Sequence, residues 1–384
     1  MFHKIIFLTK GFLNKIILYL LLIKYKNMKL KLHNSIFFIA FFVITNMFSQ
    51  NKLWEEVNTV GQVNGFLTSK LTKSNSTTLK LDFTKFKNQL MNAPLRGEKG
   101  SEKVHLSFPD EKGILEEFII YEAPVFTASL SAKYPNIKSY IGFSNSKNGS
   151  ILRMSISNKG VQTMISYKDK ETVFMQPLEN SIEKYVVYNK KAKTNLPNEE
   201  FICTTAHEIL NSTDNKGQQT SRDADDQILR KFRIAVSVNG EYTQYHGGTV
   251  AGALSAINAT LTRVNAIFET DMAVTFELQD FPQLIYTDAS TDPYSGSLSN
   301  WNVELQNTLT DEIGNDAYDI GHMFGASGGG GNAGCIGCVC QTGNKGSGYT
   351  GRSNPTGDPF DIDYVAHEIG HQFGGYHTQS NSSC

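Results

Sequence analysis

The sequence lacks the surplus of basic charge that marks a nucleic-acid-binding protein. Its 384 residues contain 36 Lys and Arg against 37 Asp and Glu, a formal net charge of −1, which excludes a strongly basic DNA-binding protein. Apolar side chains are not scarce, since 40% of residues are hydrophobic, including 24 Phe and 16 Tyr. A disordered polar tail and a collagen-like chain are therefore excluded, and the length suffices for two domains with their own cores.

The first 49 residues contain no acidic residue and no arginine, although they hold seven lysines. Residues 50–225 are slightly basic, with 23 basic and 20 acidic side chains, whereas residues 226–384 have 6 and 17. The near-zero total thus conceals a cationic leader, a slightly basic region and an acidic region. This partition predicts a boundary near residue 225.

No apolar run near the start is long enough to cross a membrane, because Ile16–Ile23 covers only eight residues of the about 20 that a span requires. Met28 instead opens a pattern typical of a secretory signal, in which lysines precede the apolar stretch Ile36–Ile44 and Ser49 marks the expected cleavage point. We predict that residues 1–49 are a leader or signal peptide with Met28 as its true start, and that the mature protein is secreted without a stable membrane span. A two-signal membrane anchor is the alternative.

Cysteine is rare, and in an exported chain five cysteines favour disulfides over free thiols. Because the number is odd, one cysteine is unpaired or its partner lies outside this sequence. The C-x₂-C-x-C run also suggests a metal site, but such sites usually need a second ligand pair, and none is visible. The five are Cys203, Cys335, Cys338, Cys340 and Cys384.

Residues 50–210 are predicted to be a mainly β propeptide domain, without a catalytic cluster. Residues 211–227 contain almost no apolar side chain and are predicted to be an exposed linker, and residues 228–384 form the second domain. Short runs rich in β-branched and aromatic residues predict strands in the first domain: Val104–Phe108, Glu117–Tyr121, Ile151–Ile156, Val161–Tyr167 and Tyr185–Tyr188.

The second domain alternates strand and helix patterns. Apolar residues recur at every second position in the predicted strands and at spacings of three and four residues in the predicted helices. This order predicts an α/β sheet with helical crossovers. The expected elements are strands at 232–238, 273–278 and 318–324 and helices at 250–268 and 298–313.

A glycine-rich stretch, residues 325–351, follows the last of these strands. It does not fit a phosphate-binding loop, because Asn344 separates Gly343 from Lys345 and Gly346 stands where Ser or Thr is required. We predict irregular loops and a short edge strand here, held by the cysteines.

The most informative segment is His367–His377, HEIGHQFGGYH. An α-helix turns about 400° in four residues, so His367 and His371 project from one face and can share a metal ion. Glu368 lies beside them, and Gly374 is where a left-handed residue can end the helix so that His377 returns to the same ion.

The start of this helix also has sequence signals. Asp358 can cap it, Pro359 suits the first helical position, and Asp361 lies near the positive end of the helix dipole. A related segment, Ala206–Leu210, copies the start of the motif but has Asn211 where the second histidine is needed, so it is predicted to be non-catalytic.

Three neutral imidazoles leave a tetrahedral Zn²⁺ with one open position, which distinguishes a catalytic from a structural site. Zinc polarises a peptide carbonyl and lowers the pKa of a bound water to about 7, while a carboxylate moves the proton to the leaving amine. The sequence therefore predicts peptide-bond hydrolysis with Glu368 as general base. The isolated His246 and His322 are expected to be ordinary hydrogen-bonded residues.

The motif resembles H-E-x-x-H-x-x-G-x-x-H of the metzincin zinc peptidases, and the preceding strand and helix order resembles the reprolysin (adamalysin-like) branch with a secreted propeptide. The resemblance covers about residues 226–378, and more loosely 50–210. It implies a mixed twisted sheet with an active-site helix. It also implies zinc ligands His367, His371 and His377, Glu368 as general base, and a protein or peptide substrate antiparallel to an edge strand near Ala333–Val339.

Two features depart from that family pattern. Thr378 stands where many reprolysins have Asp, and no Met-turn occurs between His377 and Cys384. We therefore expect the catalytic domain to be incomplete at the C-terminus, and this chain alone to be weakly active or inactive. The substrate preference cannot be predicted from it.

Cys203 is the one cysteine in residues 50–225 and precedes the linker. In several metzincin zymogens a propeptide thiolate occupies the open zinc position, so Cys203 is a candidate latency switch. A small buried residue or half of a disulfide is the alternative. Cleavage is expected after Lys216 or Arg222, and the opposite charges of the two regions predict docking that weakens with salt.

Two other functions stay open. A non-catalytic adhesin or toxin component could retain the metal site, although Glu368 would then not be needed, and a structural zinc protein would usually close its site with four protein ligands. The acidity of residues 226–384 would suit Ca²⁺, but no D-x-[DN]-x-[DN]-G loop is present.

Overall fold

The computed structural model of the protein describes residues 53–63, 66–146, 149–179, 181–193, 202–205 and 226–377. Trp54–Cys384 forms one compact unit. The predicted leader 1–49, nearly all of the predicted linker 211–227, and Cys384 lie outside the described residues. None of the helices in the described part of the chain combines the length and apolar character needed to cross a membrane.

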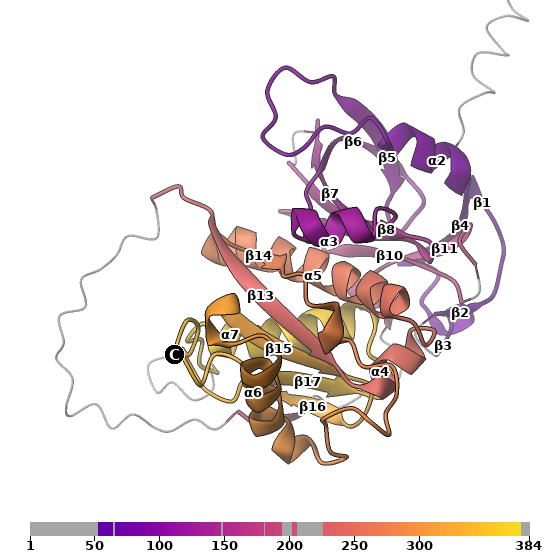
Figure 1. Cartoon of the computed structure of the whole chain (residues 1–384). Helices are drawn as coiled ribbons and strands as arrows, with labels where there is room; N and C mark the ends of the chain where they lie inside the picture. The colour runs from indigo at the N-terminus through magenta and orange to yellow at the C-terminus, as the bar shows by residue number, and fades with distance from the viewer. Residues whose placement is uncertain are drawn as a thin grey trace, which may run out of the picture. The chain divides into compact units, whose positions relative to one another are not determined.

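An antiparallel sheet of nine strands makes up the N-terminal region (Figure 1). Its order is β1-β4-β11-β10-β9-β8-β7-β6-β5, and the five predicted strands are β5, β6, β8, β9 and β11. The strands are β1 (Trp54–Glu56), β4 (Ser76–Leu81), β5 (Val104–Pro109), β6 (Leu115–Glu122), β7 (Lys138–Ser144), β8 (Ile151–Ser157), β9 (Gly160–Ser166), β10 (Val173–Pro177) and β11 (Lys184–Asn189). A two-stranded sheet pairs β2 (Gln62–Val63) with β3 (Phe66–Leu67).

This large sheet curls, so that its two outer strands meet. The indole Nε1 of Trp54 in β1 donates to the carbonyl of Ser107 in β5 at 2.7 Å. The Trp54 ring packs against Phe86 and Phe108, with ring centroids 6.3 Å apart in both pairs. Phe86 comes from α2 (Phe83–Leu90), which begins after Asp82, whose carboxylate accepts from the amide of Lys85. The sheet thus encloses an aromatic core of its own.

The C-terminal region contains a mixed six-stranded sheet with the order β12-β16-β17-β15-β13-β14. All neighbours are parallel except β16 and β17. The α/β alternation predicted from the sequence is confirmed, with helices connecting parallel strands. The strands are β12 (Ile202–Cys203), β13 (Arg230–Val238), β14 (Val274–Leu278), β15 (Ile320–Gly325), β16 (Gly329–Asn332) and β17 (Gly348–Arg352).

Two predictions for this sheet were wrong. Within the C-terminal region the outermost strand is Gly329–Asn332, with which β12 of the N-terminal region pairs. It is not the Ala333–Val339 stretch, which contains the Cys335–Cys338 disulfide. In addition, β17 is an inner strand that was taken for loop. Its glycines weaken the strand pattern in the sequence, but packing requires them. A Cβ on Gly348 would lie 2.4 Å from Gln372, and one on Gly351 would lie 2.7 Å from the carbonyl oxygen of Ser327 and 2.9 Å from Trp301.

Helix α5 (Val250–Met272) lies between the two sheets (Figure 1). Leu254, Leu261 and Phe268 belong to a core shared with β13, β14 and β15. On the other side, Ser139 of β7 donates to Asn258 at 2.9 Å. The remaining helices are α3 (Ala128–Lys133), α4 (Gly240–Tyr245), α6 (Trp301–Glu312) and α7 (His367–Gln372), the π-helix η6 (Pro359–Ala366), and the short η1 (Thr68–Lys70), η2 (Lys190–Lys193), η3 (Pro282–Leu284), η4 (Leu298–Asn300) and η5 (Asn315–Ala317).

The N-terminal region covers both edges of the six-stranded sheet. At the β14 edge, the amide of Thr127 donates to the carbonyl of Leu278 at 3.1 Å, and the amide of Leu278 donates to Val125 at 2.7 Å. At the opposite edge, β12 pairs with β16. Neither β14 nor β16 is therefore left with a fully open backbone.

Ion pairs between the two regions all have the same polarity in the part of the chain that the structure describes. The cation always comes from the N-terminal region and the anion from the C-terminal region, as their net charges would favour. The pairs are Arg96–Glu269, Arg153–Glu269, Lys133–Asp280 and Lys190–Asp363.

Candidate metal centre and active site

The motif histidines are carried by α7, which continues directly from the π-helix η6. Pro359 opens η6, as predicted from its missing N–H and fixed φ. Within α7, His367 and His371 are one turn apart and project together. Ile369 points the other way and is fully buried in the core around α5, so one face of α7 packs and the other carries the motif.

Of the two aspartates at the start of the helix, Asp361 lies in the first turn as predicted, whereas Asp358 does not act as the predicted cap. The side chain of Asp358 makes no capping hydrogen bond. It accepts instead from the hydroxyl of Tyr188 at 2.8 Å, while the carboxylate of Asp361 lies 2.8 Å from Arg263. All four side chains are buried. The partners of these carboxylates thus come from the N-terminal region and from α5. Because both are far away in the sequence, local sequence signals do not reveal these contacts.

Gly374 ends the helix, as predicted. Its φ of +100° lies in the region that favours glycine. Its amide donates to the carbonyl of His371 at 2.9 Å, and the amide of Gly375 donates to Gly370 at 2.9 Å. The reversed chain brings His377 back beside the helix.

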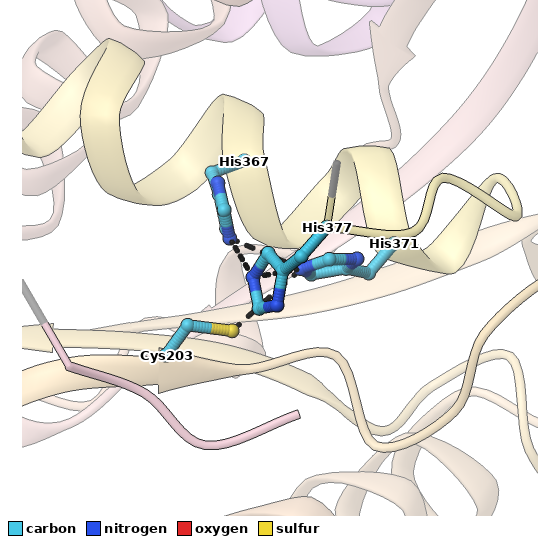
Figure 2. Close-up of side chains that lie close together, drawn as sticks. All are labelled: Cys203, His367, His371 and His377. Atoms are coloured by element: carbon cyan, nitrogen blue, oxygen red, sulfur yellow. Dashed lines mark hydrogen bonds between the residues drawn. The ribbon is translucent and has the colours of Figure 1, made fainter. Parts of the chain in front are cut away.

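The three motif histidines converge through their Nε2 atoms (Figure 2). These atoms are separated by 3.0 Å for His367 and His377, 3.0 Å for His367 and His371, and 3.1 Å for His371 and His377. Nitrogen ligands at 2.0–2.1 Å from a tetrahedral zinc ion lie about 3.4 Å apart. The triangle of nitrogens is therefore close to the size that one zinc ion needs.

The orientation of His371 leaves its converging nitrogen able to bind a metal. Its Nδ1 lies 2.6 Å from the carbonyl oxygen of Gly375. A carbonyl can only accept, so Nδ1 carries the proton and Nε2 has a free lone pair. A backbone carbonyl behind an imidazole is a common way of fixing a metal-binding tautomer.

Cys203 completes a four-residue cluster with these histidines. Its Sγ lies 3.6 Å from Nε2 of His371, and the four ligand atoms lie within 4.8 Å of one another, as a metal site would require. Burial, aided by the Glu368 carboxylate, raises the pKa of the Cys203 thiol to about 11. A thiolate at this position would need a cation beside it, which the three imidazole nitrogens are placed to hold.

Glu368 lies next to this cluster and is fully buried. The hydroxyl of Thr205 donates to its Oε2 at 2.9 Å. Burial raises the pKa of Glu368 to about 7, although hydrogen bonds from Thr205 and Cys203 oppose this shift. A Cβ on Gly331 of β16 would lie 2.5 Å from Glu368 Oε1, so glycine is required there to leave room for the carboxylate.

Thr205 was not singled out from the sequence. Its hydroxyl also accepts from the amide of Ala333 at 2.9 Å, which fixes it between the end of β16 and Glu368. The only signal in the sequence is its position two residues after Cys203. Long-range pairing of β12 with β16 was needed to reveal its contact.

A buried network supports the C-terminal end of α7. His322 lies 2.9 Å from Gln372 through Nδ1 and 2.9 Å from Thr350 through Nε2. Gln372 in turn donates to the carbonyl of Gly321 at 3.0 Å. Burial lowers the pKa of His322 to about 4, so it is neutral. His246 contacts the carbonyl of Pro355, and both histidines are hydrogen-bonded residues outside the metal cluster, as expected.

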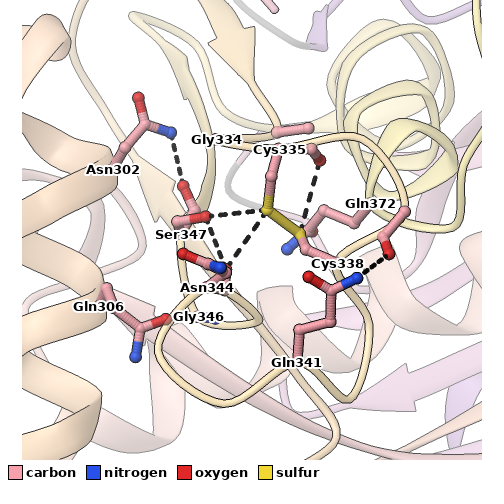
Figure 3. Close-up of a disulfide and its surroundings, with 12 residues drawn as sticks. Asn302, Gln306, Gly334, Cys335, Cys338, Gln341, Asn344, Gly346, Ser347 and Gln372 are labelled. Atoms are coloured by element: carbon pink, nitrogen blue, oxygen red, sulfur yellow. Dashed lines mark hydrogen bonds between the residues drawn. A yellow bond between two sulfur atoms is a disulfide. The ribbon is translucent and has the colours of Figure 1, made fainter. Parts of the chain in front are cut away.

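The disulfide favoured by the sequence joins Cys335 to Cys338 (Figure 3). The loop that it closes lies against α7, since the amide of Gly337 donates to the carbonyl of His371 at 3.0 Å. Among the described residues Cys203 and Cys340 have free thiols. The disulfide loop thus helps to hold the end of the helix that carries His371.

Residues 229–384 match the family described as Metallo-peptidase family M12B Reprolysin-like. This part of the chain is a reprolysin-like metallopeptidase domain. The match includes the converging histidines and strands β13 to β17 of the mixed sheet, and a peptidase of this family acts on proteins or peptides. No curated protein matches the chain.

Several predicted positions cannot be placed. The motif copy Ala206–Leu210, the cleavage candidates Lys216 and Arg222, and Thr378 lie outside the described residues. Of the predicted site residues, His367, His371, His377 and Cys203 lie together, and Glu368 lies beside them. Their roles stay predictions.

Proposed function

We propose that residues 228–384 form a zinc-dependent endopeptidase domain and that His367, His371 and His377 are its zinc ligands. The observation that carries the proposal is the convergence of three Nε2 atoms at 3.0–3.1 Å beside a buried carboxylate. When bound, zinc supplies a Lewis acid that polarises the peptide carbonyl and acidifies a water molecule.

Glu368 is the proposed general base. Its carboxylate takes the proton of the attacking water and delivers it to the amine of the departing peptide, so no covalent intermediate is needed. The glycine at position 331 supports this role, because any larger residue there would collide with Glu368. A metal-binding adhesin would need the three histidines but not this carboxylate.

The chain is also proposed to be a secreted zymogen. The signal pattern that begins at Met28 and the Cys335–Cys338 disulfide support export to an oxidising compartment. Latency is supported by Cys203, whose thiol faces the position that a substrate carbonyl and water would need. Thr205 adds a second contact, since its hydroxyl is directed at the proposed base.

The pairing of β12 with β16 explains how so short a segment reaches the site. Ile202 pairs with Gly330 and Cys203 with Gly331 in parallel register, and the amide of Thr204 donates to the carbonyl of Gly331 at 2.9 Å. The segment takes the backbone partners on β16 that an extended substrate would use. The 202–205 segment is thus proposed to block three features at once: the substrate-binding edge of β16, the metal ligands and the base Glu368.

The decisive experiment replaces Glu368 by Gln in the Cys203→Ala chain, from which the proposed block has been removed, and compares it with Cys203→Ala alone. We expect equal zinc content in the two, measured by atomic emission, with casein hydrolysis reduced by about 10²–10⁴-fold in the chain that lacks Glu368, the usual contribution of a general base. Glu312→Gln, at an exposed position at the end of α6, is the control and should retain full activity. Unchanged hydrolysis in Glu368→Gln would refute the assignment of the base, and absence of bound metal in the wild type would refute the metal centre.

A further inference from the structure

A hollow lies beside the edge strand β16, on the face opposite the histidines. Its volume is about 460 Å³. Leu298 and Ser299 of η4 and Asn302 of α6 form its outer wall, Gly329–Gly331 form its floor, and Tyr349 of β17 closes the back. Residues of the bound segment, Ile202 and Thr204, lie at its mouth.

The floor of the hollow cannot itself distinguish one side chain from another. Gly329, Gly330 and Gly331 present only backbone, and a Cβ on Gly330 would lie 2.4 Å from the carbonyl oxygen of Ile202. Glycine is therefore what allows a second strand to pair here. Backbone pairing accepts any sequence, so side-chain preference has to come from the walls.

The bound segment shows how a paired strand distributes its side chains. Successive side chains of a strand point to opposite faces. Cys203 points towards His371, at 3.6 Å, while its two neighbours Ile202 and Thr204 line the hollow. The same alternation holds for a strand of either direction, so a substrate paired with β16 also places alternate side chains in this hollow.

The two ends of the hollow differ in chemistry. Leu298 lies at the end where β16 begins, since a Cβ on Gly328 would meet it at 2.6 Å. At the other end, the side-chain Nδ2 of Asn332 donates to the hydroxyl of Thr204 at 3.1 Å. Ile202 is still 54% exposed, so an isoleucine leaves room at the Leu298 end for a larger side chain.

We propose that this hollow is a side-chain subsite of the substrate groove, with Leu298 and Asn332 as specificity-determining residues. The inference rests on the proposed peptidase function. Leu298 selects a large aliphatic or aromatic side chain, and Asn332 selects a small side chain with a hydrogen-bond acceptor, two residues away. A substrate antiparallel to β16 has the Asn332-facing residue nearer its N-terminus, the reverse of the order in Ile202–Thr204.

Binding is measured first, because it does not require catalysis. The full chain with Glu368→Gln, which prevents cleavage of the peptide, and with residues 202–205 replaced by glycine and serine to weaken their pairing with β16, is titrated with labelled hexapeptides that carry Leu or Ala at the position facing Leu298. We expect Leu298→Trp, which fills the hollow, and Leu298→Ala, which removes its wall, each to reduce the preference for Leu by about tenfold, within the range of a hydrophobic subsite. Val303→Trp, on the exposed surface of α6, is the matched control and should change nothing.

Cleavage-site profiling of a peptide library by the activated chain then separates the two proposals. The subsite is supported if the Leu298 variants lose side-chain preference at one substrate position only, and if Asn332→Ala loses it at the position two residues away. Equal binding and equal profiles in the wild type and both Leu298 variants overturn it. If the wild type cleaves no peptide yet binds them with the Leu298-dependent preference, the peptidase function fails while the subsite stands.

Discussion

The two edges of the six-stranded sheet are covered by the same N-terminal region in different ways. At the β14 edge, Val125–Thr127 pair with Leu278, and Val125 and Phe126 are buried in the core that includes α5. At the β16 edge, the described contacts come from residues 202–205 alone, and two of these, Cys203 and Thr205, face the metal cluster and the base.

This difference suggests two roles: we propose that the contacts at the β14 edge anchor the N-terminal region and that the contacts at the β16 edge block the site. The hydrogen bonds at the β14 edge and the ion pairs of Glu269 connect the N-terminal region to the C-terminal region, and none of them involves a motif histidine. The 202–205 segment, which we propose closes the site, has few contacts of its own. Variants of the first edge should change how long a cleaved N-terminal region stays bound, and variants of the second should change the activity of the intact chain.

Cys203→Ala should give the largest effect and tests the blocking edge directly. Removing the thiol opens the fourth position of the metal cluster, and we expect the basal activity of the intact chain to rise by at least about 100-fold, equivalent to about 2.8 kcal/mol. The measurement is hydrolysis of fluorescent casein by chain shown to be uncleaved on a gel. Cys340→Ala, the other free thiol of the described residues, should remain latent, and equal latency in both variants would remove Cys203 as the switch.

Arg153→Ala tests the anchoring edge. Arg153 pairs with Glu269 of α5, and both side chains are nearly buried. Truncating one partner of such a pair costs about 2–5 kcal/mol, and because Arg96 still contacts Glu269 we expect the lower end, about 30-fold faster dissociation after cleavage in the predicted linker.

The control for Arg153→Ala is Lys80→Ala, which breaks an exposed pair with Glu183 inside the N-terminal sheet. It should leave dissociation unchanged, measured by surface-immobilised binding. The uncleaved Arg153→Ala chain should stay latent. A rise in its basal activity comparable to that of Cys203→Ala would mean that anchoring and blocking are not separate.

Local patterns in the sequence predicted the parts of this arrangement that local physics determines. The spacing of His367 and His371 on one helical turn, the helix stop at Gly374 and the period-two pattern of β13 depend on neighbours within a few residues. The strand and helix order of the second domain followed from the same periodicities. The convergence of the three histidines was predicted because each step required only helix geometry and one glycine.

The rest depended on contacts between residues far apart in the sequence. Thr205 reaches Glu368 across 163 positions, and Asp361 is drawn to Arg263 across 98, so neither contact has a local signature. Strand β17 was missed for a different reason. Its two glycines, which packing against Gln372 and Trp301 requires, remove the side chains by which a strand is recognised.

The Thr205→Val variant tests how much of the proposed latency depends on the contact with Glu368 and how much on the contact of Cys203 with the metal ligands. A hydrogen bond to a charged group contributes about 1.5–3 kcal/mol. Because water can replace the Thr205 hydroxyl as a donor to Glu368 once the segment loosens, only part of this energy is lost. We therefore expect about a tenfold rise in basal activity. Thr205→Ser should keep the hydroxyl and the latency. Thr204→Val is the matched control, since Thr204 contacts Asn332 and Gly331 but not Glu368. A rise in Thr204→Val equal to that in Thr205→Val would assign the effect to general loosening of β12.

Salt should have the smallest effect, and it should act on the anchoring edge alone. Lys133–Asp280 and Lys190–Asp363 are partly exposed pairs between the regions, each worth about 0–1 kcal/mol and screened by ions. Raising NaCl from about 0.05 M to about 0.5 M should therefore speed release of the cleaved N-terminal region by about fivefold, measured by the same binding assay. The intact chain should keep its latency over this range, because the contact of Cys203 with His371 is short-range and Thr205 is buried. Release that does not depend on salt would show that apolar contacts such as those of Phe126, rather than charge, anchor the region.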